Sequence, residues 1–341
     1  MKRAPVLMAM TCGVIAAAAN GAPASAGVLD QVKQRGELIC GSNPGLAGFG
    51  VPDDKGKWTG FDVDYCRAIS AAIFGDPDKV KYVPLTAKDR FTALQTGEID
   101  VLVRNTTWTM TGDTAVGASF TSINFYDQQA FMVRARLGVK SALELNGAEI
   151  CVQRGTTNEL NLADFFRAHK MDYKPVAFGS AAETVRAYDA HRCDVFTSDS
   201  SALYAERLRM TNPAENIVLP ERISREPFAA AVRKGDGQWF DVVRWVGFGL
   251  VAAEEAGITK ANVEEKRASD NPELRRMLGV DGKLGSGIGL PNEWLVNIVR
   301  AVGNYGEIYE RNLGENSRLK IPRGQNNLWN KGGLMYAPPI R

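Results

Sequence analysis

The sequence is poor in histidine and in net charge, and both shortages narrow the chemistry open to it. Its 341 residues include two histidines, His169 and His191, and both stand among polar residues in segments of helical spacing. Two such histidines argue against histidine-based acid and base catalysis, a serine triad or a histidine-rich zinc site. The formal charge is +2, and a nearly neutral surface argues against nucleic acid as a partner. We expect no catalytic residue, no cofactor and no metal.

Long apolar runs are also scarce. The apolar stretch at residues 6–19 is 14 residues long, shorter than the roughly 20 that a membrane-spanning helix needs. It follows the basic Lys2 and Arg3 and precedes the small residues 24–26, which is the pattern of a secretory signal peptide over residues 1–26. Removal of this segment takes two bases and no acid, which leaves 39 basic and 39 acidic side chains. We therefore expect a neutral protein outside the cytoplasm.

Strands and helices alternate in two blocks, as in proteins with parallel sheets. The first block predicts strands at 37–40, 80–84 and 99–103 and helices at 61–72 and 90–95. The second predicts strands at 149–152, 174–178 and 194–197 and helices at 159–168, 181–190 and 200–210. About 315 residues are more than one core usually holds, so we expect two α/β lobes.

Two extended stretches, 129–134 and 227–232, bracket the second block and predict a hinge of two crossing strands. The expected first lobe comprises residues 27–133 and 233–341, and the second comprises residues 134–232. A helix at 239–256 is apolar nearly all round and should pack on the first lobe. The last 25 residues are rich in Gly, Asn and Pro and predict an ordered strap over the surface.

Four cysteines remain after cleavage: Cys40, Cys66, Cys151 and Cys193. An even number in an oxidising compartment indicates disulfides, and four cysteines allow three pairings. We favour Cys40 with Cys66 and Cys151 with Cys193, because each bond then lies within one predicted lobe and leaves the hinge free. Four buried free thiols are the alternative.

Several motifs resemble one family in order and spacing. They are GFDVDYCRAI (60–69), DVLVRNTTWT (100–109), QRGTTN (153–158), DVFTSD (194–199), GNYGEIYERNLG (303–314) and NLWNKGGLMYAPP (327–339). The chain resembles the periplasmic amino-acid-binding proteins of ABC importers, solute-binding protein family 3, and among them the general L-amino-acid carriers. The resemblance implies a two-lobed type II periplasmic-binding-protein fold, a free L-amino acid as ligand, and delivery to an inner-membrane permease with its ATPase. It also implies a monomer in the periplasm.

The resemblance implies a ligand-binding set at loops and strand ends: Phe49, Arg90, Asn105, Thr107, Gly155, Thr156, Thr157 and Asp199. Asn105 and Thr107 would hold the ligand, residues 155–157 would cap its α-carboxylate, and Asp199 would bind its α-ammonium group. Phe49, beside Leu46, would meet the ligand's side chain. The alternatives from the residues alone are structural: polar turns, a packed aromatic ring, and Asp199 as a cap for the helix that follows. Asp62 is interpreted as a capping or turn residue.

One position departs from the family pattern. Gly112 stands where the family has an Arg that binds the ligand's α-carboxylate. Three explanations remain open: another cation takes the place of the Arg, the ligand lacks that carboxylate, or the protein binds its ligand weakly. Arg90 is the best-placed substitute, whereas Arg104 and Arg154 are predicted to point away from the cleft.

Two other functions fit the same scaffold. One is a periplasmic enzyme similar to the cyclohexadienyl dehydratases, which would act on a carboxylated substrate. The other is a ligand-sensing partner of a membrane receptor. Release of the ligand unchanged separates a carrier from the enzyme.

Overall fold

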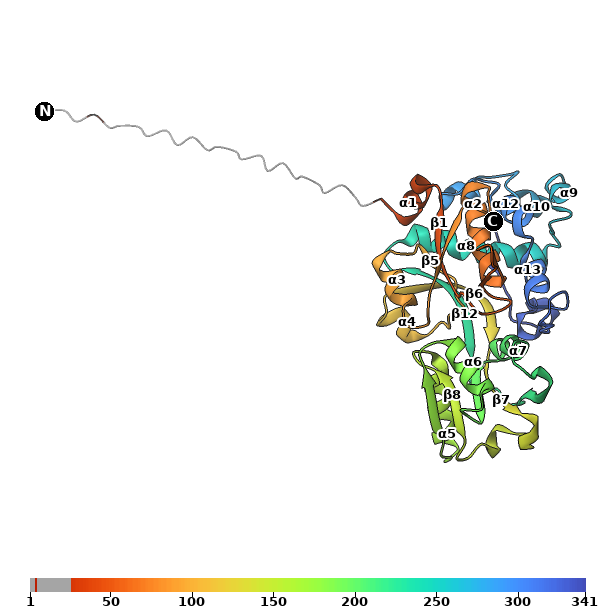
Figure 1. The fold of residues 1–341 in the computed structure, drawn as a ribbon. Helices are drawn as coiled ribbons and strands as arrows, with labels where there is room; N and C mark the ends of the chain where they lie inside the picture. The colour runs from red at the N-terminus through yellow and green to blue at the C-terminus, as the bar shows by residue number, and fades with distance from the viewer. Residues whose placement is uncertain (1–3, 5–25) are drawn as a thin grey trace.

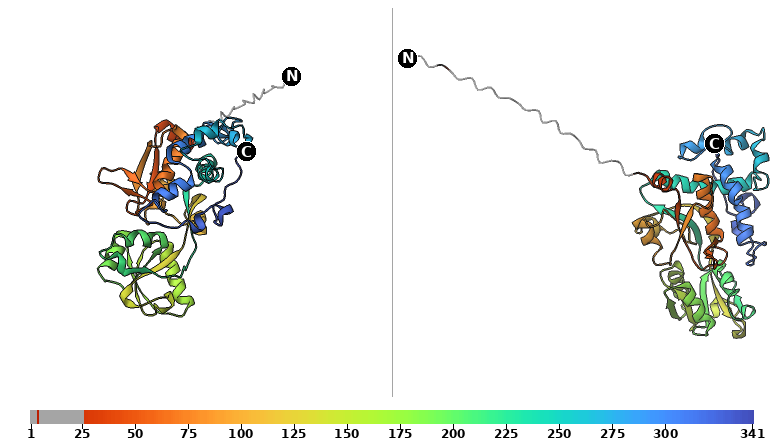
Figure 2. Two further views of the ribbon diagram at one scale, coloured as in Figure 1. Left: turned by 90° about the vertical axis from the view of Figure 1, so that its right-hand side faces the viewer. Right: turned by 45° about the horizontal axis from the view of Figure 1, so that its top comes forward.

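Two separate β-sheets, each flanked by helices, divide the chain into two lobes (Figures 1 and 2). The computed structural model describes residue 4 and residues 26–341, so the predicted signal peptide lies outside the described residues except for Ala4 and Ala26. Both lobes combine helices with a mixed sheet of parallel and antiparallel strand pairs, which confirms the predicted α/β class. Within the described part of the chain, no helix has the length and apolar character that crossing a membrane requires.

The first lobe contains a five-stranded sheet in the order β4-β1-β5-β12-β6. Its strands are β1 (Leu38–Ser42), β4 (Val80–Pro84), β5 (Val101–Leu102), β6 (Ala118–Asp127) and β12 (Glu226–Arg233), and β2 (Val51–Pro52) with β3 (Trp58–Thr59) forms a separate hairpin. Its helices are α1 (Val28–Arg35), α2 (Phe61–Phe74), α3 (Arg90–Thr96), α4 (Met110–Thr114), α8 (Gly237–Glu255), α9 (Val263–Arg267), α10 (Pro272–Met277), α11 (Leu284–Gly287), α12 (Trp294–Val302) and α13 (Tyr305–Asn312).

The second lobe contains a sheet in the order β11-β7-β10-β8-β9. Its strands are β7 (Gln129–Arg134), β8 (Glu149–Gln153), β9 (Lys174–Phe178), β10 (Val195–Asp199) and β11 (Asn216–Val218), and its helices are α5 (Thr157–Ala168), α6 (Ala181–Asp189) and α7 (Ser200–Arg207). Apolar clusters cover both faces of this sheet, one around Tyr188 and Phe196 and the other around Phe131 and Phe166. The lobe thus has its own core.

The chain changes lobe twice, at positions that differ from the predicted boundaries. β6 ends at Asp127 in the first sheet, and β7 pairs with β10 in the second from Gln129 onward. The return runs between β11 and β12, and β12 pairs with β6 from Glu226. Residues 129–133 therefore lie in the second sheet and residues 226–232 in the first. Hydrogen bonding between strands decides sheet membership, and the extended pattern of a strand does not reveal its partner.

Helix α8 packs on the first lobe, as its apolar sequence predicted. Trp239 is fully buried there, and its Nε1 donates a hydrogen bond of 2.9 Å to the backbone carbonyl of Asp100. Val242, Val246 and Leu250 follow on the same buried face. This contact joins α8, which follows the second crossing between the lobes, to the part of the first lobe that precedes the first crossing.

The C-terminal segment forms the expected strap. Leu328 and Met335 are buried in the core of the first lobe and form a short parallel bridge. The Asn326 side chain accepts a hydrogen bond of 2.6 Å from the backbone N–H of Tyr126 and donates one of 3.0 Å to its carbonyl. Because β6 is the outermost strand of its sheet, the strap covers a sheet edge close to the first crossing.

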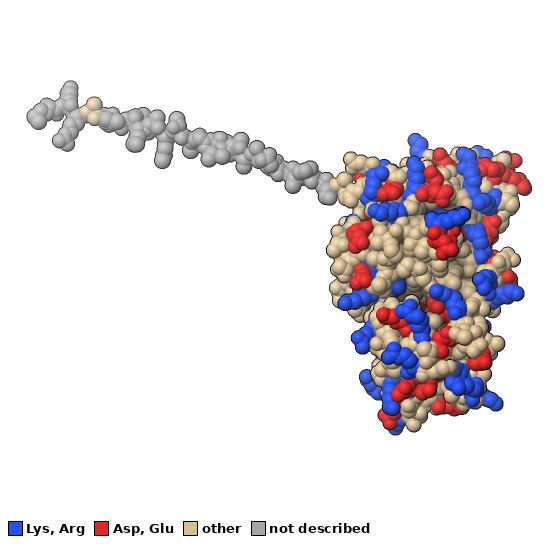
Figure 3. Space-filling model, in the orientation of Figure 1, with Lys and Arg blue, Asp and Glu red and all other residues tan. Residues whose placement is uncertain are grey.

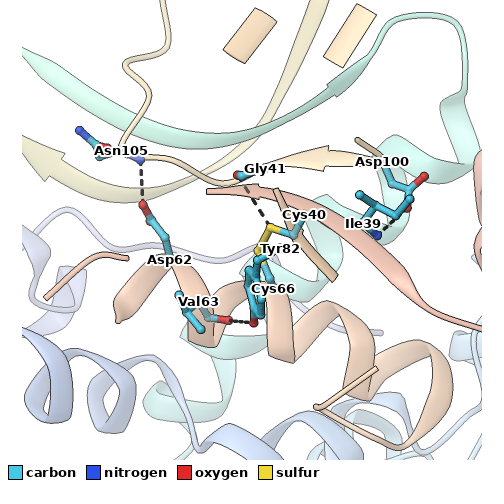
Figure 4. Close-up of a disulfide and its surroundings, with 9 residues drawn as sticks. All are labelled: Ile39, Cys40, Gly41, Asp62, Val63, Cys66, Tyr82, Asp100 and Asn105. Carbon is cyan, nitrogen blue, oxygen red and sulfur yellow. Dashed lines mark hydrogen bonds between the residues drawn. A yellow bond between two sulfur atoms is a disulfide. The ribbon is translucent and has the colours of Figure 1, made fainter. Parts of the chain in front are cut away.

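The predicted disulfide pairing is confirmed. Cys40 of β1 is bonded to Cys66 of α2 in the first lobe (Figure 4), and Cys151 is bonded to Cys193 in the second. The sequence separations are 26 and 42 residues. Neither bond joins the two lobes, so neither restricts their relative motion.

Candidate functional site

A cavity of about 530 Å³ is lined by residues of both lobes. The first lobe contributes Asn43, Leu46, Leu85, Arg90, Arg104, Asn105 and Thr107. The second lobe contributes Gln153, Thr156, Thr157, Asn158, Ser198 and Asp199 and one face of α6. The volume lies within the usual range of small-ligand sites.

A buried carboxylate joins the two lobes beside this cavity. Glu226, at the start of β12, is 1 % exposed, and its Oε2 accepts hydrogen bonds from the hydroxyls of Thr107 and Thr157. Its Oε1 accepts from Asn161 Nδ2 and from Ser224 Oγ, both at 2.7 Å. Thr107 belongs to the first lobe and Thr157 to the second, so one side chain holds both. The sequence analysis missed Glu226; its signal was an acidic residue immediately before a buried strand.

The N-terminus of α5 faces the cavity without a side-chain cap. Thr156 occupies the N-cap position, but its hydroxyl donates to the Gln153 carbonyl at 2.8 Å and accepts no first-turn N–H. Thr156, Thr157 and Asn158 all line the cavity. The free N–H groups of a helix start, together with the helix dipole, favour an anion at this place.

Arg90 is a buried cation in the cavity wall. It is 8 % exposed, and its Nε has no hydrogen-bond partner among the described residues. Burial lowers the pKa of Arg90 to about 10, while the charges of Asp199 and Glu226 act in the opposite direction. Burial of a guanidinium without full hydrogen bonding destabilises the folded state, so this position favours the binding of a carboxylate.

Arg104 also lines the cavity, which contradicts the expectation that it points away from the cleft. It is 5 % exposed, and its Nε donates to the Leu85 carbonyl at 2.9 Å. Burial and the neighbouring charge of Arg90 lower its pKa to about 9. Arg104 lies two residues beyond the end of β5, where side chains no longer alternate between the two faces of the sheet. Arg154 is exposed in the turn after β8.

Asp199 supplies the opposite charge. It is the last residue of β10, and its Oδ1 accepts a hydrogen bond of 2.9 Å from Asn158 Nδ2. Burial, then the charges of Asp127 and Glu226, raise the pKa of Asp199 well above its usual value. Asp127 accepts hydrogen bonds from the Ser201 hydroxyl and backbone, and burial raises its pKa to about 6. A cationic group placed at Asp199 would relieve this repulsion.

Asp62 orients the loop of the first lobe that contains Asn105 and lines the cavity. It makes no side-chain cap on α2, contrary to its interpretation as a capping residue. Its Oδ2 instead accepts the backbone N–H of Asn105 at 2.8 Å (Figure 4), and Asn105 has a φ of 35°. Burial raises the pKa of Asp62 to about 7, against the hydrogen bond from Asn105 and the charge of Arg104. The contact fixes a strained residue at the cavity wall.

Two of the predicted ligand contacts, Phe49 and Gly155, need correction. Phe49 is fully buried in the core, where its ring packs edge-on against Phe125 at 5.3 Å, and only its neighbour Leu46 lines the cavity. Gly155 lies outside the cavity lining, and its N–H donates to Glu159 Oε2 at 3.1 Å. Trp108 stacks on Phe120 in a different hollow of the first lobe. Burial of the large apolar ring in the core explains why Phe49 does not line the cavity although its neighbour Leu46 does.

Gly112 is closely packed rather than open. It lies in α4, where its N–H donates to Thr109 Oγ1, and a Cβ placed on it would meet Phe120 Cε2 at 2.6 Å. The position therefore holds no cation, and the surroundings leave no room for a side chain without movement of Phe120. Arg90 and Arg104 are the two arginines of the first lobe that line the cavity.

No group of three or more potential metal ligands occurs among the described residues. The face of the molecule seen in Figure 3 carries both signs of charge interspersed over both lobes. The site therefore offers separate anion-binding and cation-binding groups within a small cavity between two lobes.

Comparison with known proteins agrees with this description. Residues 38–275 match the model of the bacterial extracellular solute-binding proteins, family 3. The chain belongs to this family, and its fold is the type II periplasmic-binding-protein fold.

Three relatives cover nearly the whole chain. The general L-amino acid-binding periplasmic protein AapJ of Rhizobium johnstonii is 56% identical over 98% of this chain and 99% of its own length. The glutamate/glutamine/aspartate/asparagine-binding protein BztA of Rhodobacter capsulatus is 55% identical over 96% of this chain and 97% of its own length. A solved ABC-transporter periplasmic binding protein from Brucella ovis, with glutathione bound, is 57% identical, covers 93% of this chain and 100% of its own, and has a TM-score of 0.91.

Proposed function

We propose that the protein is the extracytoplasmic solute-binding component of an ABC importer and that it binds free L-amino acids in the cavity between its lobes. The observation that carries this proposal is the arrangement of opposite charges across one small cavity. Arg90 and the uncapped start of α5 favour a carboxylate, and Asp199 favours an ammonium group. A free α-amino acid carries both groups on one carbon atom.

The charge arrangement supports the assignment of ligand contacts. Arg90 takes the place of the family Arg missing at Gly112 and binds the α-carboxylate together with the N–H groups of Thr157 and Asn158. Asp199 binds the α-ammonium group. Asn105 and Thr107 line the first-lobe side, where Thr107 acts through its backbone because its hydroxyl is held by Glu226.

The names of the relatives support a broad ligand range. AapJ is described as a general L-amino acid-binding protein, and BztA as a binder of glutamate, glutamine, aspartate and asparagine. Glutathione is a second candidate ligand, because the similar Brucella protein holds it and because the cavity of about 530 Å³ is roomy for one amino acid.

The mechanism we propose is hinge closure. Ligand contacts from both lobes shift the population toward the closed form, which an inner-membrane permease with its ATPase would recognise. The residues that cross between the sheets, near Gln128 and between Val218 and Glu226, would absorb the rotation. We expect a monomer in the periplasm.

The test is isothermal titration of the refolded, ligand-stripped mature protein with each L-amino acid. Micromolar affinity for several amino acids is expected, with the ligand recovered unchanged. Absence of binding by every amino acid at millimolar concentration would reject the carrier proposal. Conversion of prephenate or arogenate would support the enzyme alternative instead.

A further inference from the structure

Helix α6 lines the cavity along its whole length, on the side of the second lobe that faces the first (Figure 1). The lining residues of this helix share one face: Ser180, Ala181, Ala182, Val185, Arg186 and Asp189. At a rise of 1.5 Å per residue, the distance from Ala181 to Asp189 is about 12 Å. Three linked residues in extended form span roughly 10 Å, whereas one spans about 3.5 Å. The cavity therefore continues well beyond the space of one amino acid.

The far part of the cavity is lined by charged groups. Asp189 accepts hydrogen bonds from the backbone and hydroxyl of Thr211, and Glu206 pairs with Arg209 at 3.7 Å. Arg209 also donates a hydrogen bond of 2.8 Å to the Gly45 carbonyl of the first lobe. Asp189 is thus held by the neutral Thr211 and Glu206 by an ion pair, whereas the exposed Arg186 has no ion-pair partner within residues 26–341. Arg186 is therefore the charged group at this end that is available to bind an anion.

The part of the cavity around Arg90 and Asp199 restricts which covalent structure a long ligand can have. In the proposed binding mode, Arg90 and the start of α5 bind a carboxylate and Asp199 binds an ammonium group, so both groups on the α-carbon must be free. A peptide linked through its α-carboxylate or α-amino group cannot offer both on one carbon. A long ligand must therefore extend through the side chain of its first amino acid.

We propose that the part of the cavity between α6 and Arg209 is a second subsite, for amino acids whose side chain is extended by an amide bond to a unit with its own carboxylate. This is the γ-glutamyl peptide class. Arg186 binds the second carboxylate, and Ala181, Ala182 and Val185 give the connecting atoms an apolar wall without bulky side chains. The inference rests on the proposed amino-acid-binding function, because the first residue of the ligand occupies that same site.

The experiment is isothermal titration of the ligand-stripped mature protein with L-glutamine, γ-glutamylglycine, α-glutamylglycine, glutathione and the glycyl ethyl ester of glutathione. We expect binding of glutamine, γ-glutamylglycine and glutathione, no binding of the α-linked peptide, and at least tenfold weaker binding of the ester than of glutathione. Arg186→Ala should weaken glutathione binding at least tenfold and leave glutamine binding unchanged. Arg167→Ala, an exposed arginine on α5, is the matched control and should change neither.

The outcomes separate the two proposals. Glutamine binding without any binding of γ-glutamyl peptides at millimolar concentration overturns the second subsite and leaves the carrier proposal intact. Equal affinity for glutathione and its ester, or an unaffected Arg186→Ala variant, overturns the role of Arg186. Failure of every amino acid and peptide to bind overturns both proposals. The ester is measured on the unaltered protein, so this test does not depend on the folding of a variant.

Discussion

The carboxylate of Glu226 accepts a hydrogen bond of 2.8 Å from the hydroxyl of Thr157, across the boundary between the two lobes. The same oxygen accepts from Thr107 on the other side. The threonine hydroxyls that the family resemblance implied for a ligand are thus held by the protein itself. Glu226 fixes the positions of both cavity walls and leaves the backbone N–H groups there for the ligand.

Replacement of this carboxylate should destabilise the protein. Glu226→Gln keeps the shape but turns one acceptor into a donor that faces other donors, which costs about 1–3 kcal/mol for a buried group. The measurement is urea unfolding of the ligand-free protein. Glu221→Gln is the control, because Glu221 accepts similar hydrogen bonds from Ser141 and Ala142 within the second lobe alone. An unchanged unfolding free energy in Glu226→Gln would show that the hydrogen bonds of Glu226 with both lobes contribute nothing to stability.

Replacement of the buried Arg90 should weaken ligand binding without lowering the stability of the folded protein. In Arg90→Met, loss of the charged partner of a carboxylate costs roughly 2–5 kcal/mol, or about thirtyfold to several thousandfold in amino-acid affinity. The melting temperature of the empty protein should not fall, because a buried cation with an unsatisfied Nε is removed. Titration calorimetry and a thermal melt on the same sample measure both effects.

The control for that experiment is Arg154→Met, in an exposed turn outside the cavity lining. It should leave both quantities unchanged. If Arg90→Met lowers the melting temperature and leaves affinity intact, Arg90 has a structural role and does not replace the missing family arginine.

The stability of the ligand-free protein should depend on pH through Asp62. Its pKa rises from 3.8 in the unfolded chain to about 7 in the folded protein, mainly by burial. The folded state therefore binds more protons than the unfolded state between these values. The stability that Asp62 contributes is complete below pH 3.8 and is lost as the pH rises through about 7.

The Asp62→Asn variant tests this assignment, because the amide keeps an oxygen for the Asn105 N–H and does not titrate. The decline of unfolding free energy between pH 4.5 and 7.5 should become shallower by up to about 1.4 kcal/mol per pH unit. Urea unfolding at a series of pH values supplies the data. Parallel curves for the variant and the original protein would contradict a raised pKa at this residue.

The packing at Gly112 gives a prediction for a double-mutant cycle. Gly112→Ala places a methyl group 2.6 Å from Phe120 Cε2, and overpacking of this kind costs about 1–3 kcal/mol. The Phe120→Leu background opens the space, so the same substitution should cost less there. Thermal or urea unfolding of the four proteins gives the coupling. Additive effects would mean that the backbone of α4 shifts instead.

The sequence predicted the elements of both lobes well where periodicity was strong. The helix from Phe61 and the strands at 80–84 and 174–178 agree with α2, β4 and β9. The ten-residue strand β6 was missed, and the lobe boundaries shifted, because strand partners depend on contacts far apart in the chain.

The site was predictable to a similar degree. The family resemblance assigned Arg90, Thr157 and Asp199 to one site, and all three line the cavity, because strand ends and helix starts meet there. Phe49 and Arg104 were misjudged, since local spacing does not say whether a side chain turns into the core or the cleft. Glu226 could be recognised only after folding brought its four donors together.

The amide of Asn326 on Tyr126 has a consequence for the folding of the protein. It occupies the backbone of the outermost strand much as a neighbouring strand would. An uncovered strand edge is a template for pairing with another chain. Asn326 lies 200 residues after Tyr126 in the sequence, so this edge stays open until the segment around Asn326 docks on the first lobe. Docking of that segment thus protects each molecule against joining a second copy edge to edge.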